Sequence, residues 1–244
     1  MEEQPYHTLM NLNNPDLKSN DTLQSLDSLD RSKFLIVGIA GISRSGKSSS
    51  RKYLEKSLTI NPRNLFNLDN FFVHPEKKFD DTIQDYIENW DTPDILLFKE
   101  LHQAIAQRML DIEKEGSVFN RINNDEGDKG DKDDTENKAN HCVLKKEIIV
   151  VEGYILFHSQ LIWDFLDVKI MIDLSYEEAK KRRLNNKNFH GEHGEYYFDN
   201  YIWKGFHQYN ECFDNNQGGS YVIKGNQSLD SLCQEVEDIV TKHL

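Results

Sequence analysis

The stretch Phe34-Leu-Ile-Val-Gly-Ile-Ala-Gly-Ile-Ser-Arg-Ser-Gly-Lys-Ser48 decides which fold this sequence adopts. Its first part, residues 34–39, is a continuous apolar run, which is typical of a strand buried on both faces of a parallel sheet. Its second part, residues 41–48, matches the pattern G-x-x-x-x-G-K-[ST] in full. This pattern forms a phosphate-binding loop when it lies between a strand and a helix, and the residues from Ser48 to Leu58 have a helical pattern. We therefore predict a strand, a phosphate-binding loop and a helix.

The rest of the chain alternates between strand and helix patterns. Apolar runs predict strands at residues 65–66, 146–151, 168–172 and 220–223. Helices are predicted at residues 92–112, 176–186 and 229–244, with Thr92 and Pro93 at the start of the first. This alternation predicts an α/β fold with a doubly wound parallel sheet in a single domain.

The charge of the chain is unevenly distributed. The 244 residues include 29 Lys and Arg against 42 Asp and Glu, which gives a formal charge of −13. This acidic balance argues against duplex nucleic acid and anionic membranes as partners, because both are polyanions. Residues 1–32 hold six acids and two bases, and residues 123–140 hold seven acids and three bases with a single apolar residue. We predict a disordered tail over 1–32 and a folded domain over 33–244, interrupted by an acidic disordered insertion over 113–140.

The sequence indicates a cytoplasmic protein. No apolar run approaches the roughly 18 residues of a membrane span, and the N-terminus lacks the basic and apolar regions of a secretory signal. The three cysteines, Cys142, Cys212 and Cys233, are odd in number and lack the spacing of metal ligands, which fits reduced thiols. We expect a monomer or weak dimer whose partners are small molecules, with no nucleic acid and no membrane among them.

The phosphate-binding loop carries its own chemistry. Its glycines allow successive backbone N–H groups to point at nucleotide phosphates, and the positive end of the following helix adds to the attraction. Lys47 would reach the β- and γ-phosphates, and the hydroxyl of Ser48 would ligate Mg²⁺. The predicted ATP-binding residues in this loop are Gly41, Ser43, Arg44, Ser45, Gly46, Lys47, Ser48 and Ser49. Kinases, ATPases, GTPases and nucleotide-sensing modules share such a loop, so acidic residues elsewhere must distinguish them.

Two acidic residues follow predicted strands. Asp69 comes shortly after strand 65–66, and Glu152 comes directly after strand 146–151. Because the carboxyl ends of neighbouring parallel strands line one crevice, both carboxylates are expected near the phosphates. Asp69 could accept a proton from a substrate hydroxyl or orient that hydroxyl, and Ser48, Asp69 and Glu152 together form the predicted Mg²⁺ site. The alternatives are a surface aspartate that caps a turn and a solvated glutamate at a strand end.

Four consecutive basic residues, Lys180 to Arg183, lie in the predicted helix 176–186. They could form a solvated helix face that complements the helix dipole. Alternatively, they adjoin a lid over residues 184–199, and their arginines fold over the transferring phosphoryl group. Consecutive helical positions point in different directions, so at most two of the four can serve one site, and Arg182 and Arg183 lie nearest the expected lid. The predicted catalytic residues are Lys47, Asp69 and Arg182.

Six segments, in the same order, resemble one family, the nicotinamide riboside kinases, which are relatives of the uridine kinases among the P-loop nucleoside kinases. They are GISRSGKSS, LDNFF, NWDTPDILLF, IIVVEGYILF, SYEEAKKRR and YYFDNYIW, and the resemblance covers residues 33–244 apart from 113–140. It implies transfer of a phosphoryl group from ATP to the 5′-hydroxyl of nicotinamide riboside, which yields nicotinamide mononucleotide for NAD synthesis. ATP as phosphoryl donor and Mg²⁺ are the implied cofactors.

The resemblance also implies roles for individual residues. It makes Asp69, the first acid of a DDFF-like motif whose second position is Asn70 here, the catalytic carboxylate. It directs Arg182 toward ATP and Arg183 toward the substrate, although the residues after Arg183 lack the further arginine that the family usually shows. The residues that would hold adenine are Gly225, Asn226 and Gln227; apart from the resemblance, they could equally form a plain loop. The implied substrate-binding residues are Asp69, Phe72, Trp90, Asp91 and Arg183.

The pair Trp90-Asp91 has suitable chemistry for a nucleoside clamp. An indole can stack on a cationic pyridinium ring, and a carboxylate can accept hydrogen bonds from both the 2′- and the 3′-hydroxyl of ribose. Apart from the resemblance, Trp90 could also be an aromatic residue of the core or of its rim. Two other functions stay open: a uridine or cytidine kinase or another small-molecule P-loop kinase, and a regulatory module that binds nucleotide without transferring phosphate.

Overall fold

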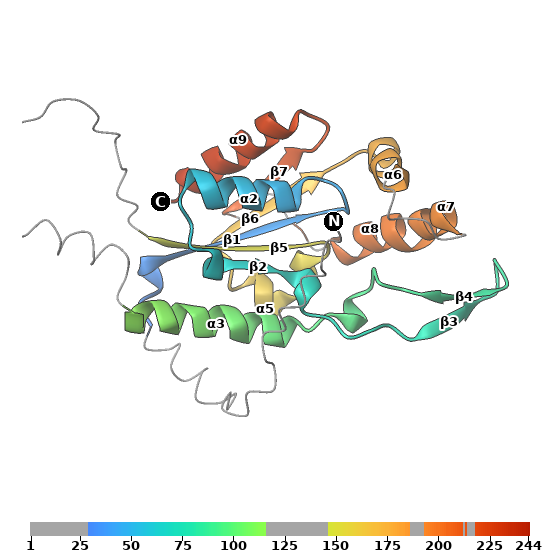
Figure 1. Cartoon of the computed structure of the whole chain (residues 1–244), viewed down its shortest axis with the longest axis horizontal. Coiled ribbons are helices and arrows are strands. Elements are labelled where there is room, and N and C mark those ends of the chain that lie inside the picture. Colours follow the sequence, from blue (N-terminus) through green and yellow to red (C-terminus); the bar gives the residue numbers. More distant parts are fainter. Residues whose placement is uncertain (1–28, 116–145, 186–192, 212, 214–217) are drawn as a thin grey trace, which may run out of the picture.

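Five parallel strands form the centre of the molecule (Figure 1). This computed structural model describes residues 29–115, 146–185, 193–211, 213 and 218–244. The strands are β1 (Phe34–Gly41), β2 (Leu65–Asn67), β5 (Glu147–Gly153), β6 (Val168–Asp173) and β7 (Ser220–Lys224), in the spatial order β2-β5-β1-β6-β7. The chain moves from β1 to one edge of the sheet and later crosses to the other, so β1 lies in the middle. The predicted doubly wound parallel sheet is confirmed.

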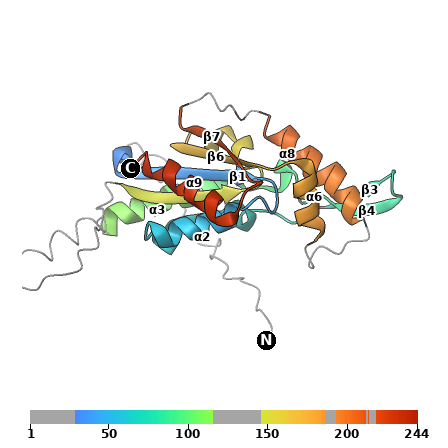
Figure 2. The ribbon, with the colours of Figure 1, turned by 90° about the horizontal axis from the view of Figure 1, so that it is seen from above.

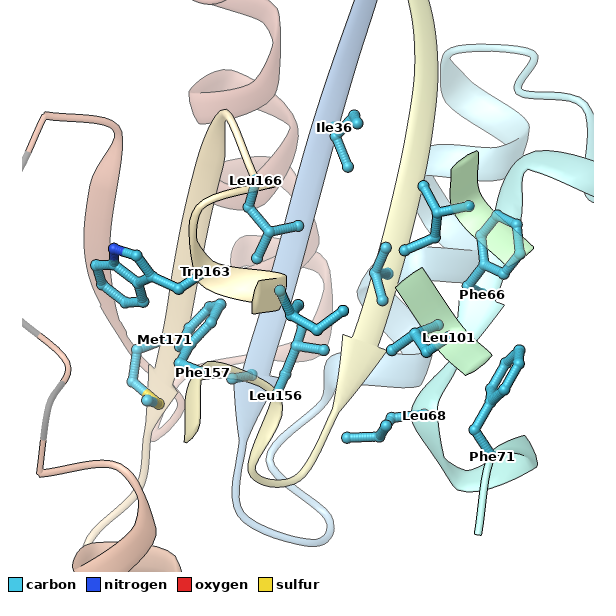
Figure 3. Close-up of a cluster of buried hydrophobic side chains, with 14 of the residues drawn as sticks. Ile36, Phe66, Leu68, Phe71, Leu101, Leu156, Phe157, Trp163, Leu166 and Met171 are labelled. Atoms are coloured by element: carbon cyan, nitrogen blue, oxygen red, sulfur yellow. The ribbon is translucent and has the colours of Figure 1, made fainter. Parts of the chain in front are cut away.

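Helices cover both faces of this sheet, as Figures 1 and 2 show. Every residue of β1 is buried, as its unbroken apolar sequence predicts, and its side chains alternate between two core layers. Leu35 packs in the layer under α2 (Lys47–Ser57) and α9 (Leu229–Thr241). Ile36 packs in the layer over α3 (Phe98–Glu115) and α5 (Gln160–Trp163), which Figure 3 shows in close-up. These two layers hold the carboxyl end of β1, and the loop after it, in place.

The remaining elements lie beyond the carboxyl ends of the strands, at the same end as the phosphate-binding loop (Figure 1). They are α6 (Tyr176–Leu184), α7 (Gly194–Tyr197), a π-helical turn (Phe198–Trp203), α8 (Lys204–Tyr209) and a hairpin of β3 (Lys77–Asp80) and β4 (Asp85–Glu88). The hairpin was not predicted, because two strands of four residues give little pattern. Asp80 of the hairpin accepts hydrogen bonds from the hydroxyls of Tyr201 at 2.6 Å and Tyr196 at 2.8 Å. These bonds tie the hairpin to the α7 segment and lower the pKa of Asp80 to about 2.

The first of the predicted long helices begins later than the sequence suggests. Residues Pro93–Ile95 form only a short 3-10 turn, and α3 starts at Phe98. The backbone between them is extended, and the N–H of Leu97 donates to the carbonyl of Phe71 at 2.9 Å. A backbone that pairs with a neighbouring segment cannot also continue a helix. The prediction of one helix from Thr92 onward is therefore wrong, and Thr92 makes no capping hydrogen bond through its side chain.

The ordered part of the chain also extends into both segments that the sequence predicts to be disordered. Leu29 is buried in the core, and Asp30 caps the 3-10 turn that precedes β1, so ordered structure begins inside the predicted tail. α3 continues to Glu115, so residues 113–115 are helical and do not belong to an insertion. The rest of the tail, the rest of the insertion and residues 186–192 of the predicted lid lie outside the described residues.

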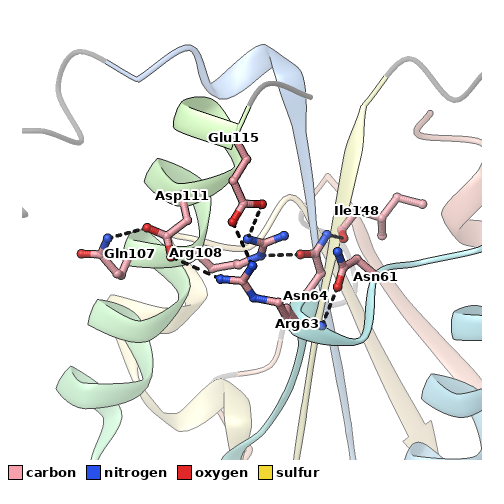
Figure 4. Close-up of polar contacts among 8 residues, drawn as sticks. All are labelled: Asn61, Arg63, Asn64, Gln107, Arg108, Asp111, Glu115 and Ile148. Atoms are coloured by element: carbon pink, nitrogen blue, oxygen red, sulfur yellow. Dashed lines mark hydrogen bonds and ion pairs between the residues drawn. The ribbon is translucent and has the colours of Figure 1, made fainter. Parts of the chain in front are cut away.

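A buried arginine anchors α3 at the end of the sheet away from the phosphate-binding loop (Figure 4). The Nε of Arg108 donates to Oδ1 of Asn64 at 2.7 Å, and Nδ2 of Asn64 donates to the carbonyl of Ile148 near the start of β5. Glu115 forms an ion pair with Arg108 at 3.3 Å and another with Arg63 at 2.8 Å. The buried guanidinium is therefore both hydrogen-bonded and paired, which a buried charge requires.

Candidate active site

Two glycines give the loop between β1 and α2 its shape. Gly46 has φ +113°, in the left-handed region, and a Cβ atom there would lie 2.5 Å from Leu232. A Cβ atom on Gly41 would lie 2.8 Å from the backbone oxygen of Ile172 on β6. Only glycine fits either position without a shift of its neighbours. The loop thus turns its backbone toward the N-terminus of α2, where anions bind favourably.

A cavity of about 480 Å³ lies beside this loop. Most of the predicted ATP-binding residues line it, namely Ser43, Arg44, Ser45, Gly46, Lys47, Ser48, Ser49, Arg182, Gly225 and Gln227. Two others do not: Gly41 packs against β6, and the side chain of Asn226 bonds to the backbone N–H and the hydroxyl of Ser175 at 3.4 and 3.3 Å. Leu229 and Leu232 at the start of α9 also line the cavity, and sequence reasoning missed them. They supply an apolar wall next to the loop after β7.

Arg182 joins three parts of this cavity. Its Nε donates to Glu178 within α6 at 2.6 Å, its Nη1 donates to the carbonyl of Arg44 at 3.3 Å, and its Nη2 donates to the carbonyl of Gly225 at 3.1 Å. The guanidinium thus lies between the phosphate-binding loop and the loop after β7. A solvated helix face, one of the two interpretations of the basic run, does not describe this residue.

Glu152 lies at the end of β5, directly against the phosphate-binding loop. Its carboxylate is 1% exposed and accepts a hydrogen bond from the hydroxyl of Ser48 at 2.7 Å and another from Nε of Arg51 at 2.8 Å. It is therefore not a solvated strand-end residue. The ion pair with Arg51 satisfies the buried charge, and the sequence analysis did not anticipate this arginine. The bond to Glu152 orients the hydroxyl of Ser48 at the first turn of α2.

Asp69 and Lys47 lie close together on the wall that two cavities share. Asp69 belongs to a 3-10 turn directly after β2, where its N–H donates to the side chain of Asn67 at 2.9 Å. Burial raises the pKa of Asp69, the nearby charge of Lys47 opposes this, and Glu152 adds to the rise. Burial lowers the pKa of Lys47, opposed chiefly by Asp69. A carboxylate with a raised pKa beside a half-buried lysine is suited to accept a proton.

The oxygen atoms of Ser48, Asp69 and Glu152 are suitable ligands for Mg²⁺. Within the described ranges, no cluster of three or more His, Cys, Asp or Glu residues is arranged to hold a metal ion by itself. Mg²⁺ prefers oxygen donors, and beside phosphates it commonly takes only one or two protein ligands, with phosphate oxygens and water as the others. One hydroxyl and two carboxylates next to a phosphate-binding loop therefore fit such a site.

A second cavity, of about 220 Å³, adjoins the first. All five predicted substrate-binding residues line it, namely Asp69, Phe72, Trp90, Asp91 and Arg183. Sequence reasoning missed the other side chains on its wall, chiefly Tyr154, Leu68, Ile95, Leu96 and Ile155. Tyr154 follows Glu152 by two positions at the end of β5, so its place after a strand was the available signal.

Trp90 and Asp91 lie on this wall in different surroundings. Trp90 is 41% exposed and meets Phe72 and His74 edge-on, with ring centroids 5.4 and 4.7 Å apart, so it is not a core residue. Oδ2 of Asp91 accepts a hydrogen bond from the hydroxyl of Tyr197 at 2.9 Å. Burial raises the pKa of Asp91, and the Tyr197 bond and the charge of Arg183 oppose the rise. Arg183 itself donates to the hydroxyl of Ser43 in the phosphate-binding loop at 3.0 Å.

Comparison with known proteins gives several relatives of low identity, and the nicotinamide riboside kinases among them are covered over most of their length. The chain is 27% identical to nicotinamide riboside kinase of Saccharomyces cerevisiae over 188 residues, which is 71% of this chain and 76% of that protein. It is 22% identical to human nicotinamide riboside kinase 1 over 85% of this chain and 93% of that protein. It is 28% identical to uridine kinase of Schizosaccharomyces pombe over 65% of this chain and 33% of that protein. No protein-family model matches the chain.

None of the helices in the described ranges combines the length and the hydropathy that crossing a membrane needs. The fold is a five-stranded parallel sheet with flanking helices, and the phosphate-binding loop adjoins a cavity lined by acidic and aromatic side chains. The chain is thus similar to P-loop kinases, namely the nicotinamide riboside kinases and the uridine kinases.

Proposed function

We propose that this protein is a nucleoside kinase that transfers the γ-phosphoryl group of ATP to the ribose 5′-hydroxyl of nicotinamide riboside, which gives nicotinamide mononucleotide for NAD synthesis. One observation carries the proposal: the two adjoining cavities share three wall residues, Ser43, Lys47 and Asp69. A donor in the larger cavity and an acceptor in the smaller one would meet beside Asp69. The 27% identity to a nicotinamide riboside kinase supports the choice of substrate.

Asp69 has the properties of the residue that activates the acceptor. Its carboxylate would accept the proton of the 5′-hydroxyl while the hydroxyl oxygen forms a bond to the γ-phosphorus. The bond from the γ-phosphorus to the bridging oxygen breaks, and ADP leaves with the electron pair. The raised pKa of Asp69 favours proton acceptance, because a more basic carboxylate is a better base.

Cations on the cavity walls would stabilise the charge of the transferring group. Lys47 lines both cavities, and Arg182 and Arg183 reach the phosphate-binding loop from α6. Positive groups fixed before the reaction stabilise a charged transition state without reorganisation. Ser48, with Asp69 and Glu152, would hold Mg²⁺, which supplies further positive charge beside the β- and γ-phosphates when bound.

Trp90 and Asp91 would bind the nucleoside at the far side of the smaller cavity. The exposed indole of Trp90 offers a flat, electron-rich face to the cationic pyridinium ring of nicotinamide riboside. The carboxylate of Asp91 would accept hydrogen bonds from the 2′- and 3′-hydroxyls. The neighbouring carboxylate of Asp69 also favours a cationic substrate.

The test is an assay of ADP release with nicotinamide riboside, uridine and cytidine offered separately to the full chain. We expect the highest kcat/KM with nicotinamide riboside, and mass spectrometry should detect nicotinamide mononucleotide. A preference for uridine or cytidine would assign the chain to the pyrimidine nucleoside kinases. ATP binding without ADP release from any of the three would contradict the proposal and favour a nucleotide-binding regulatory module.

A further inference from the structure

One tyrosine hydroxyl joins the two residues of the proposed nucleoside clamp. The oxygen of Tyr197 accepts a hydrogen bond from the backbone N–H of Trp90 at 2.9 Å, and its proton is donated to Oδ2 of Asp91, also at 2.9 Å. The direction of both bonds is fixed, because a backbone N–H can only donate and the phenol has a single proton. Tyr197 therefore holds the main chain of one clamp residue and the side chain of the other.

We propose that Tyr197 is a positioning residue for the nucleoside, which orients Asp91 so that its second carboxylate oxygen faces the ribose hydroxyls. The inference rests on the proposed function. Among the described residues, Tyr197 makes the one hydrogen bond seen to the carboxylate of Asp91. Oδ1 is then left to accept from the substrate. The bond to the N–H of Trp90 fixes the main chain that carries the indole.

The ring of Tyr197 is held independently of its hydroxyl. It stacks on Tyr201, with ring centroids 5.1 Å apart and an angle of 18° between the planes, and the hydroxyl of Tyr201 is bonded to Asp80 of the hairpin. The hydroxyl of Tyr154 donates to the carbonyl of Ile202 in the π-helical turn, which fixes the same segment to the end of β5. Loss of the Tyr197 hydroxyl alone should therefore leave the ring, and the segment, in place.

The groups around Asp91 determine how its pKa changes when the hydroxyl of Tyr197 is lost. Burial raises the pKa of Asp91, and the bond from Tyr197 is the largest effect that lowers it. Arg183 and Lys47 also lower it, Asp69 raises it, and Tyr154 faces Asp91 from β5. Without the Tyr197 bond, the pKa of Asp91 should rise further, so the ionised form that accepts from ribose is lost at a higher pH.

The experiment compares Tyr197→Phe with the matched variant Tyr201→Phe, which removes a hydroxyl from the same segment that bonds to Asp80 and to neither clamp residue. In Tyr197→Phe we expect the KM for nicotinamide riboside to rise about tenfold, as for a lost hydrogen bond to a charged group, with the KM for ATP unchanged. The acidic limb of the kcat/KM profile should move to higher pH. Tyr201→Phe should change neither quantity.

A double-mutant cycle separates positioning from a general loss of structure. In an Asp91→Asn background, Tyr197→Phe should have a much smaller effect on the nucleoside KM than in the wild type, because both changes disturb the same contact. Equal effects in both backgrounds, or an unaltered nucleoside KM in Tyr197→Phe, would overturn the positioning role. A wild-type chain that phosphorylates no nucleoside would contradict the proposed function itself, and the positioning role with it.

Discussion

The hydroxyl of Ser48 and the carboxylate of Glu152 meet at 2.7 Å, although the two residues lie 104 positions apart in the chain. The contact joins the first turn of α2 to the last residues of β5. It also brings together two of the three oxygen-bearing side chains that are expected to hold Mg²⁺.

Glu152→Gln keeps the shape of the side chain but removes the charge that Arg51 pairs with at 2.8 Å. Because the pair is largely buried, we expect the free energy of unfolding to fall by about 2 kcal/mol and kcat to fall more than tenfold. Chemical denaturation and steady-state kinetics would measure the two effects. The double variant Arg51→Gln/Glu152→Gln should regain stability without regaining kcat. Wild-type kcat in the single variant would refute a role for the charge in catalysis.

Asp69→Asn removes the proposed base while the cavity keeps its shape. We expect kcat to fall by a factor of about 10²–10⁴, as for loss of a general base, while ATP binding stays measurable. Stopped-flow kinetics and calorimetric titration with ATP would test the two parts separately. The matched control is Asn70→Asp, which places a second acid at the next position of the same turn. Turnover of Asp69→Asn within a factor of two of the wild type would argue against proton acceptance by this residue.

We expect Asp91 to lower the stability of the fold near neutral pH and to strengthen binding of the nucleoside. Burial raises its pKa above the unfolded value, so the fold disfavours its ionised form, and its contribution to stability falls as pH rises through the raised pKa. Asp91→Asn should therefore raise the melting temperature near neutral pH, with the gain disappearing below the pKa of an unfolded aspartate. The same change should raise the KM for nicotinamide riboside at least about tenfold, because a charged acceptor is lost. A lower melting temperature at neutral pH would contradict this account.

As the pH is lowered, we expect the activity to decline at a higher pH than it would if its aspartates had ordinary pKa values. Both Asp69 and Asp91 have raised pKa values, because loss of hydration in the cavity disfavours the ionised form of each carboxylate, and both must be ionised in the proposed mechanism. The logarithm of kcat/KM should therefore fall as the pH decreases through these values, above the usual range near pH 4. Because Asp69 acts in the chemical step, Asp69→Asn should abolish most activity throughout, whereas Asp91→Asn should leave one ionisation in the profile. A profile flat down to pH 4 would be inconsistent with the two raised values.

Gly46→Ala tests the shape of the phosphate-binding loop. The residue has φ +113°, and a Cβ atom would approach Leu232 to 2.5 Å. We expect the free energy of unfolding to fall by about 1–3 kcal/mol and the affinity for ATP to weaken, because the loop must shift. Gly218→Ala is the control, since a Cβ atom there meets nothing within 4 Å. Equal stability of the two variants would show that the loop tolerates a side chain at residue 46.

Local sequence determined the sheet and the phosphate-binding loop. A continuous apolar run such as residues 34–39 can be buried on both faces only inside a parallel sheet covered by helices, and the glycine pattern after it permits one kind of turn. The position of acids directly after strands was also predictable from local pattern. Parallel strands bring their carboxyl ends together, so such acids lie near one another. For this reason the sequence alone predicts that Asp69 and Glu152 lie at the same carboxyl end of the sheet.

Only the tertiary structure decided which partners these residues have. α3 starts later than its apolar pattern predicts because the N–H of Leu97 donates to the carbonyl of Phe71, on the far side of the β3–β4 hairpin in the chain, and no helical pattern encodes this contact. The hydroxyl of Tyr197 reaches Trp90 and Asp91 over more than 100 positions, so only the tertiary structure, which places the end of α7 beside these two residues, brings them together. Periodicity along the chain reports which face of an element is buried. It does not report which distant side chain meets that face, and the proposed clamp depends on such contacts.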